Sequence, residues 1–351
     1  MSPAPALGFA FPGSLDTPTG GYVYDRRMIR ALRELGAHVE ECALPTRFPW
    51  PTQADIAETL ARLRAARGDV LVVDGLAYGA LPDSALADLA TPVVALVHHP
   101  LFLETGLSPD MSAALKQTEG AALRRAAAIV ATSALTARVV RETFGVRDVL
   151  VAEPGVDPAP RAAGAGDGVV DLLAVGAVSP RKGYDTLLRA LAGVCGAWRL
   201  TIVGARDRAP DCARTLDRLV DEFGLRESVV FSGALEEAAL AAAYARADVF
   251  VHPAFLEGYG MALAEAVARG LPILASAEAA AAGAAEGAGL VTAPAGDVTA
   301  FAAALGRLVA DEEWRTRLAA RSWDAAGRQM RWQDSARKML RALQLARSAY
   351  S

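Results

Sequence analysis

The feature that most constrains the fold is a repeated alternation of short apolar runs with helical stretches. In the first half, "ALGFAF", "DVLVVDG" and "TPVVALVHH" are separated by helical patterns such as "YDRRMIRALRELG". The second half repeats the alternation with "VVDLLAVGAV", "WRLTIVG" and "ADVFVHPA". Strands joined by helical crossovers run parallel in a sheet that carries helices on both faces. The sequence therefore predicts an α/β protein with two doubly wound, Rossmann-like domains facing a central cleft.

The two series are separated by a segment without periodicity. Residues 156–168, "VDPAPRAAGAGDG", are rich in Pro, Gly and Ala, which is typical of a connector. A length of 351 residues also fits roughly two domains of ordinary size. We predict an N-terminal domain over 1–160, a C-terminal domain over 161–325, and a final helix over 326–351 that crosses back to the first domain.

Charge and composition exclude several classes of function. A net charge of -4 gives no overall attraction to nucleic acid, so no nucleic-acid partner is expected. Three widely spaced cysteines offer neither a disulfide framework nor a zinc motif, and no D-x-D or His/Cys cluster occurs, so we expect no metal and no cofactor. No apolar run reaches 18 residues and the start lacks a basic leader, so the sequence predicts a cytoplasmic protein.

A membrane surface is a partner that the sequence allows but does not favour. Arg62, Arg64 and Arg67 lie on one helical stretch that follows "RFPWP", and such a face could dock on anionic lipid at the inner side of a membrane. A solvated helix face is the preferred interpretation, because exposed arginines are common.

The loops at the carboxyl ends of the strands should carry the chemistry, because ligands of open α/β sheets bind there. After "ADVFVHPA", Glu257 precedes the turn Gly258-Tyr259-Gly260, and Glu265 follows within a helix. A carboxylate can accept hydrogen bonds from two sugar hydroxyls, and the helix amino terminus can bind an anion. The alternative is a capping carboxylate with a solvated helix glutamate.

Three further loops offer candidates. Arg181 and Lys182 follow "DLLAVGAV" and suit phosphate oxygens, although they could also be solvated surface cations. His98 and His99 lie at the carboxyl end of the strand-like "VVALVHH", where a functional role is favoured over a structural one, and His98 is the candidate. Gly21 follows the first strand and leaves room for a ligand close to the backbone.

Together, "RKG", "VVFSG" and "ADVFVHPAFLEGYGMALAEAVARGLPILAS" resemble the retaining glycosyltransferases of family 4, which have the GT-B fold. The resemblance covers nearly the whole chain. It implies that Glu257 and His98 lie by the donor sugar, that Glu265 holds the ribose, and that Lys182 and Arg181 bind the diphosphate. It also implies donor contacts from the main chain of the turn that comprises Gly258, Tyr259, Gly260 and Met261, and from Gly21.

Two departures from the family pattern stand out. Ala177 replaces the arginine usual after the strand-end glycine, and "AEAAAAGAAEGAG" replaces a G-G-x-x-E segment. The resemblance implies transfer of a sugar from a nucleotide-diphosphate donor, UDP-sugar favoured over GDP-sugar, to a hydroxyl of a lipid, polysaccharide or small molecule. A non-catalytic nucleotide-sugar-binding subunit remains the alternative. A dinucleotide-dependent dehydrogenase is disfavoured because G-x-G-x-x-G is absent after the first strand.

Overall fold

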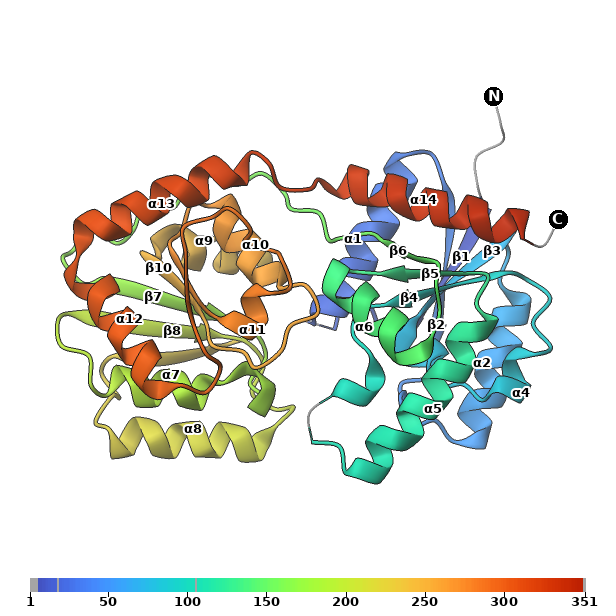
Figure 1. The fold of residues 1–351 in the computed structure, drawn as a ribbon, viewed down its shortest axis with the longest axis horizontal. Coiled ribbons are helices and arrows are strands. Elements are labelled where there is room, and N and C mark those ends of the chain that lie inside the picture. The colour runs from blue at the N-terminus through green and yellow to red at the C-terminus, as the bar shows by residue number, and fades with distance from the viewer. Residues whose placement is uncertain (1–5, 18, 105, 350–351) are drawn as a thin grey trace. The chain divides into compact units, whose positions relative to one another are not determined.

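In the computed structural model, which describes residues 6–17, 19–104 and 106–349, the chain forms two compact units. Unit 1 comprises Met1–Gly155 and Met330–Ser351, and unit 2 comprises Val156–Gln329. Each unit holds one six-stranded sheet with helices packed on it (Figure 1). Every strand pair is parallel. The predicted α/β fold with two Rossmann-like sheets is therefore confirmed.

The sheet of unit 1 has the order β2-β1-β3-β4-β5-β6. Its strands are β1 (Ala6–Pro12), β2 (His38–Leu44), β3 (Val70–Asp74), β4 (Val93–Val97), β5 (Ala128–Ala131) and β6 (Val149–Val151). Its helices are α1 (Gly20–Glu34), α2 (Gln53–Ala65), α3 (Gly75–Tyr78), α4 (Asp83–Leu86), the 3-10 turn η1 (Leu101–Leu103), α5 (Pro109–Arg125), α6 (Ala134–Phe144) and α14 (Trp332–Ser348). The direction of winding reverses between β1 and β3, which makes their carboxyl ends the expected ligand position.

The sheet of unit 2 has the order β12-β11-β10-β7-β8-β9. Its strands are β7 (Val170–Val175), β8 (Trp198–Val203), β9 (Val229–Gly233), β10 (Val249–His252), β11 (Ile273–Ser276) and β12 (Leu290–Ala293). Its helices are η2 (Pro180–Lys182), α7 (Tyr184–Leu191), α8 (Pro210–Glu222), α9 (Glu237–Arg246), α10 (Met261–Ala268), α11 (Ala277–Ala280), α12 (Val298–Ala310) and α13 (Glu312–Ala326). Here winding reverses between β7 and β10, so the loops after these two strands lie side by side.

Hydrophobic strands explain both cores. Every residue of β3, β4 and β5 is buried, as are all residues of β10 and β11, so these strands are covered on both faces. Such continuous apolar runs are typical of parallel sheets, in which helices cover both sides. The rigid sheets then fix the loops at their carboxyl ends.

The structure divides the chain at Gly155 and Val156, whereas the sequence suggested residues 160 and 161. Gly155 packs so closely on the main chain of Trp332 that an added Cβ would lie 2.2 Å from the Trp332 nitrogen. Ala162 already donates from its main-chain N–H to the Arg269 carbonyl at 2.9 Å within unit 2. The final helix, predicted over 326–351, is α14, which begins at Trp332 and belongs to unit 1, while α13 ends at Ala326.

A buried acid in unit 1 gives a testable pH dependence of stability. Glu119 on α5 is 1% exposed, and its Oε2 accepts from the Leu101 N–H at 3.0 Å. Burial raises the pKa of Glu119 from 4.5 to about 8. Since the folded protein holds this proton more tightly, its contribution to stability is present below about pH 4.5 and is lost as the pH rises to about 8.

We expect Glu119→Gln to remove this part of the pH dependence. The amide oxygen can still accept from Leu101, but it carries no charge at high pH. The variant should exceed the wild type in free energy of unfolding by about 4 kcal/mol at about pH 9, and by far less at about pH 5. Urea unfolding at both pH values checks this, and parallel pH profiles for the two proteins would contradict it.

No helix among residues 6–17, 19–104 and 106–349 combines the length and the apolar character that a bilayer span requires.

Candidate functional site

The first part of the site consists of two loops at the carboxyl ends of β7 and β10 in unit 2. Main-chain bonds join them: the Phe255 N–H donates to the Arg181 carbonyl at 2.8 Å. In the other direction, Arg181 Nη1 donates to the Leu256 carbonyl at 2.7 Å. The loop predicted to bind phosphate and the loop predicted to bind sugar therefore form one connected surface at the point where the sheet's winding reverses.

Gly183 makes this approach possible. Its φ is +65°, and it directly precedes α7. An added Cβ would lie 2.2 Å from the carbonyl oxygen of Pro253 on the other loop. Both the left-handed conformation and the contact exclude a side chain, so only glycine fits here.

Glu257 is the electrostatic centre of the two loops. It is 9% exposed, and its Oε1 accepts from Lys182 Nζ and lies 2.9 Å from His252 Nε2 and 3.6 Å from Arg181 Nη1. Burial alone would raise the pKa of Glu257, but the charge of Lys182 and the hydrogen bond to His252 outweigh it and hold this pKa well below its usual range. Glu257 is therefore an ionised carboxylate held in place by two hydrogen-bond donors, Lys182 and His252, with the charge of Arg181 nearby.

His252 is a member of this group that the sequence analysis missed. It ends β10, is 2% exposed, and stacks on Phe250 with ring centroids 6.0 Å apart. Burial and the charge of Lys182 lower the pKa of His252, so it is neutral near pH 7 and donates from Nε2 to Glu257. The criterion that selected His98, a histidine at the carboxyl end of a strand, would also have found it.

The turn after Glu257 presents main-chain amides. Gly260 has φ +92° and is the amino-terminal cap of α10, where no side chain accepts a cap hydrogen bond. The first N–H groups of a helix lack intrahelical partners, so those of Met261 and its neighbours can bind an anion. Gly258 and Tyr259, which form the turn itself, are half-buried.

Glu265 lies in the body of α10, where it is half-buried. Its Oε2 accepts from the hydroxyl of Tyr244 at 2.9 Å. The guanidinium of Arg269 lies 4.5 Å from the centroid of the Tyr244 ring and donates to the main-chain carbonyl of Glu265 at 3.0 Å. Tyr244 comes from α9, so sequence spacing alone gave no signal for it. The Tyr244 hydroxyl therefore orients the carboxylate, and Arg269 packs on the Tyr244 ring.

The remaining predicted residues, His98 and Gly21, belong to unit 1. His98 directly follows β4, and its Nε2 lies 3.0 Å from Oδ1 of the fully buried Asp25 on α1. Gly21 lies against the histidine ring, because an added Cβ there would be 3.5 Å from His98 Cδ2. The sequence analysis missed Asp25, which is four residues after Gly21 on the same helix.

Asp74, the last residue of β3, completes this second group. Asp25, Asp74 and His98 each offer an atom within 4.8 Å of the others. Although this spacing could suit a cation, His98 Nε2 is already hydrogen bonded to Asp25, so we do not assign the three as metal ligands. Burial alone would lower the pKa of His98, but the charge of Asp25 and its hydrogen bond outweigh burial and raise this pKa above its ordinary value.

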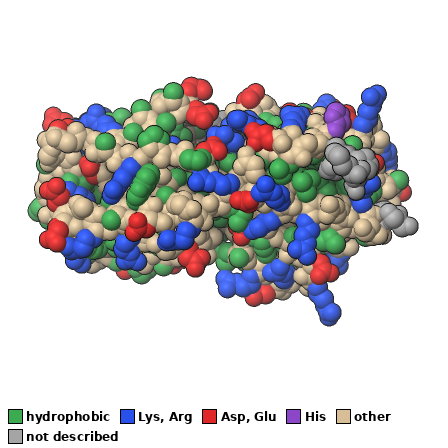
Figure 2. Space-filling view, turned by 90° about the horizontal axis from the view of Figure 1, so that it is seen from above, with side chains coloured by type: hydrophobic (Ala, Val, Ile, Leu, Met, Phe, Trp, Pro, Cys, Tyr) green, Lys and Arg blue, Asp and Glu red, His purple; other side chains and the backbone are tan. Residues whose placement is uncertain are grey.

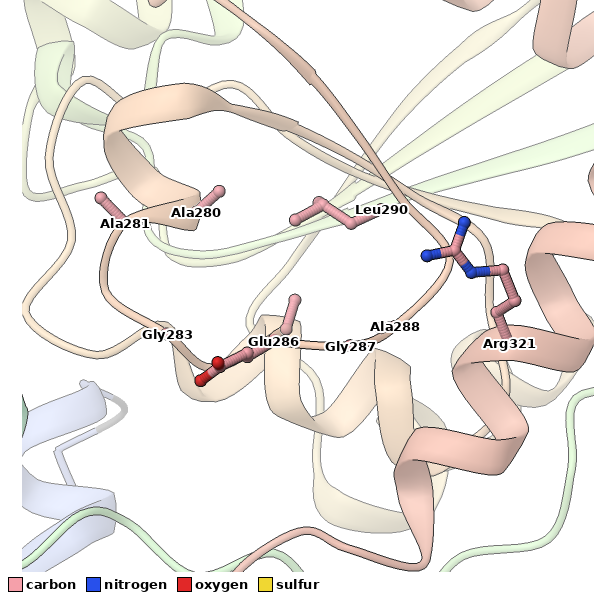
Figure 3. Close-up of a pocket in the computed structure, with 9 residues that line it drawn as sticks. Ala280, Ala281, Gly283, Glu286, Gly287, Ala288, Leu290 and Arg321 are labelled. Atoms are coloured by element: carbon pink, nitrogen blue, oxygen red, sulfur yellow. The ribbon is translucent and has the colours of Figure 1, made fainter.

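Both departures from the family pattern can be located in the structure. A hollow of about 510 Å³ lies along the segment that replaces G-G-x-x-E, and it includes none of Lys182, Glu257 and Glu265. In Figure 3, Arg321 extends from α13 toward Leu290 across this hollow. Ala177 is half-buried at the end of β7 and supplies no charge, so Arg181 and Lys182 are the cations of that loop.

The surface gives little support to an extended cationic face. Figure 2 shows basic and acidic side chains intermixed over one side of the molecule. On α2, Arg62 pairs with Glu58, and Arg64 lies 4.0 Å from Asp88. These pairs reduce the net positive charge that the α2 arginines could present to an anionic partner.

Comparison with protein families gives two matches, one for each half of the chain. Residues 22–160 match the family described as Glycosyltransferase Family 4, and residues 170–311 match Glycosyl transferases group 1. A D-inositol 3-phosphate glycosyltransferase from Xylanimonas cellulosilytica is 34% identical over 179 residues, which are 48% of this chain and 40% of that protein. The chain thus spans less than half the length of the curated relatives that it matches first.

Solved structures match over almost the whole chain. Sucrose-phosphate synthase from Thermosynechococcus elongatus has a TM-score of 0.83 at 21% identity, and the match covers 98% of this chain and all of that one. Anabaena HepE in complex with UDP-glucose has a TM-score of 0.76 at 17% identity, covering 97% of this chain and 99% of that one. At these identities the likeness shows the fold. The chain belongs to the family 4 type of glycosyltransferases, with the GT-B fold.

Proposed function

We propose that this chain is a retaining glycosyltransferase that moves a sugar from a nucleotide-diphosphate donor to an acceptor hydroxyl. The observation that carries the proposal is the group formed by Lys182, Arg181, Glu257 and His252 on two joined loops. This group places cations and an ionised carboxylate beside the uncapped amino terminus of α10. A ligand that carries an anion next to several hydroxyl groups, as a nucleotide sugar does, would interact with all of these groups at once.

Each part of the donor has a suitable neighbour. Lys182 and Arg181, with the first amides of α10, would bind the diphosphate. Glu257 would accept from the sugar hydroxyls, with its orientation set by His252. Glu265 would accept from the ribose, with its orientation set by Tyr244. His98 and Gly21 in unit 1 are proposed to act at the sugar and the phosphate.

The chemical step follows from where charge develops. Cleavage of the bond between the sugar and the diphosphate leaves negative charge on the departing phosphate, which Lys182 and the helix amides would stabilise. We propose that the acceptor hydroxyl attacks on the same face and passes its proton to the leaving phosphate, so that the anomeric configuration is retained. No step in this scheme requires a metal ion.

The proposal is tested by incubating the protein with UDP- and GDP-sugars together with lipid, polysaccharide and small-molecule acceptors. Turnover is measured as released nucleotide, and the anomeric configuration of the product by NMR. We expect release that persists in EDTA and a product of unchanged configuration. Saturable donor binding with no release, over the whole panel, would instead establish the non-catalytic binding subunit, which the loss of the usual arginine at Ala177 favours.

A UDP-sugar is the favoured donor, because UDP-glucose is the ligand named for the HepE structure with this fold. Calorimetric titration with UDP and GDP compares the two nucleotides directly. The membrane surface, as a less favoured partner, is tested by co-sedimentation with anionic liposomes.

Glu265→Gln should weaken nucleotide binding by about tenfold while leaving the fold intact. The amide can accept from Tyr244 but loses the charge that strengthens hydrogen bonds from the ribose. Loss of a charge-assisted bond is worth about 1.5 kcal/mol, which is about tenfold in Kd. Titration with UDP measures the change, and the exposed Glu222→Gln on α8 serves as the control. Equal affinities for both variants would exclude the ribose role.

A further inference from the structure

The ring of His98 is held on several sides within unit 1. Its Nε2 is hydrogen bonded to Asp25, its ring meets the Tyr24 ring edge to face at 5.1 Å, and Gly21 lies against it. The side chain is nevertheless 20% exposed. Since Nε2 is occupied, Nδ1 is the ring nitrogen left for a ligand.

Behind this ring lie two carboxyl groups buried together. Asp25 is fully buried and Asp74 is 3% exposed, and both lie where the winding of the sheet reverses between β1 and β3. Asp74 Oδ1 accepts from the Leu76 N–H at 2.7 Å. Asp25 Oδ2 has no hydrogen-bond donor among the described residues, although it is inaccessible to solvent. Two carboxylates this close in a buried site cannot both be ionised without a large electrostatic cost.

We propose that Asp25 and Asp74 are positioning residues that hold one proton between them and keep His98 as an imidazolium with Nδ1–H directed to a ligand oxygen. A proton on Asp74 supplies Asp25 Oδ2 with the donor that it otherwise lacks. The group then contains one anion, Asp25, and one cation, His98. It is therefore neutral overall, which is the arrangement that a low-dielectric interior favours.

The surrounding charges support this assignment. Burial, followed by the charge of Asp25, raises the pKa of Asp74 from 3.8 to about 7, so Asp74 retains a proton far closer to neutral pH than an ordinary aspartate does. Glu153 lies near Tyr24 and is paired with Lys338 of α14 at 2.6 Å. Glu119 lies near Gly79, the residue after α3, where an added Cβ would be 3.1 Å from Glu119 Cγ. No other described cation is paired with Asp25 or Asp74.

The consequence for sugar transfer rests on the proposed function: a charged donor at Nδ1 would favour an oxygen of the donor sugar or its phosphate. The charge state itself can be measured without turnover. The full chain, labelled with 13C and 15N in histidine, has four histidines, so its NMR spectrum is simple. The His98 signal is assigned as the one missing from His98→Gln.

In the wild type, we expect His98 to stay doubly protonated to a higher pH than an ordinary histidine does. Asp25→Asn should lower this midpoint by about one unit or more, because it removes the anion. Asp74→Asn, which mimics the uncharged, protonated Asp74, should leave the His98 midpoint high. If transfer occurs, the alkaline limb of its pH profile should move with Asp25→Asn and not with Asp74→Asn.

Three results would overturn the proposal. One is a protonation midpoint of His98 in the wild type that is ordinary or lowered. This measurement does not depend on whether any variant folds. Another is an equal fall in both variants, which would mean a merely structural role. The third is a stoichiometric divalent metal in the purified protein that releases the His98 signal on chelation, which would identify the three residues as a metal site.

Discussion

Lys182→Met should lower the rate of sugar transfer by about 10²- to 10³-fold. Lys182 is the cation that contacts Glu257 directly, and it is proposed to stabilise the departing diphosphate. Loss of one preorganised group that stabilises developing charge costs a factor of this size. Methionine keeps most of the length of the side chain while removing its charge. Released nucleotide, measured at saturating donor, gives the effect on the chemical step.

A double variant separates chemistry from stability. Lys182→Met alone leaves Glu257 buried without its main counterion, which should also cost about 3 kcal/mol or more of unfolding free energy. Adding Glu257→Gln removes the buried charge, so stability should recover, while transfer stays low because both Lys182 and the proposed sugar-binding carboxylate are lost. Arg189→Met, an exposed cation on α7, is the matched control. Activity that returns with stability in the double variant would show that Lys182 acts only on the fold.

Gly183→Ala should destabilise unit 2 by about 3–5 kcal/mol and abolish most transfer. The left-handed conformation costs an alanine about 1–2 kcal/mol. The added Cβ would also lie 2.2 Å from the Pro253 carbonyl oxygen, so the two loops must separate. Lys182, which is next to Gly183, would then move away from Glu257. Urea unfolding gives the stability, and released nucleotide gives the activity.

Two other glycines of unit 2 distinguish the cost of the left-handed conformation from the cost of the close contact. Gly224 has φ +66° with nothing within 4 Å of an added Cβ, so Gly224→Ala should show the conformational cost alone. Gly193 has no positive φ and a nearest neighbour at 3.9 Å, so Gly193→Ala should be nearly neutral. If Gly183→Ala lowered the free energy of unfolding no more than Gly224→Ala does, the close approach of the two loops would contribute nothing to the effect.

Much of the fold could be predicted because it depends on local pattern. Buried strands such as "VLVVD" and helices between them specify parallel sheets, whatever their order. The order of the strands depends on contacts between residues that are far apart in the chain. So does the position of the boundary between the two units at Gly155. The start of the final helix was placed at residue 326 and not at Trp332, because "AAGRQMRW" contains only one glycine to signal the later start.

The candidate site was predictable to the extent that its residues follow strands. Lys182 and Glu257 lie on loops that the alternation of strands and helices places at one edge, and the structure joins them. Tyr244 and Asp25 were missed because each comes from a helix and meets its partner only after folding. The structure also shows the ionic pairing of Lys182 with Glu257, where the sequence suggested separate roles at phosphate and sugar.

A crystal structure of the protein with a UDP-sugar would test where the donor binds. We expect diphosphate oxygens within hydrogen-bond distance of Lys182 Nζ and of the first amides of α10. We also expect sugar hydroxyls on Glu257 and the ribose on Glu265. A nucleotide bound elsewhere, for example in the hollow beside Arg321, would contradict the proposed donor site.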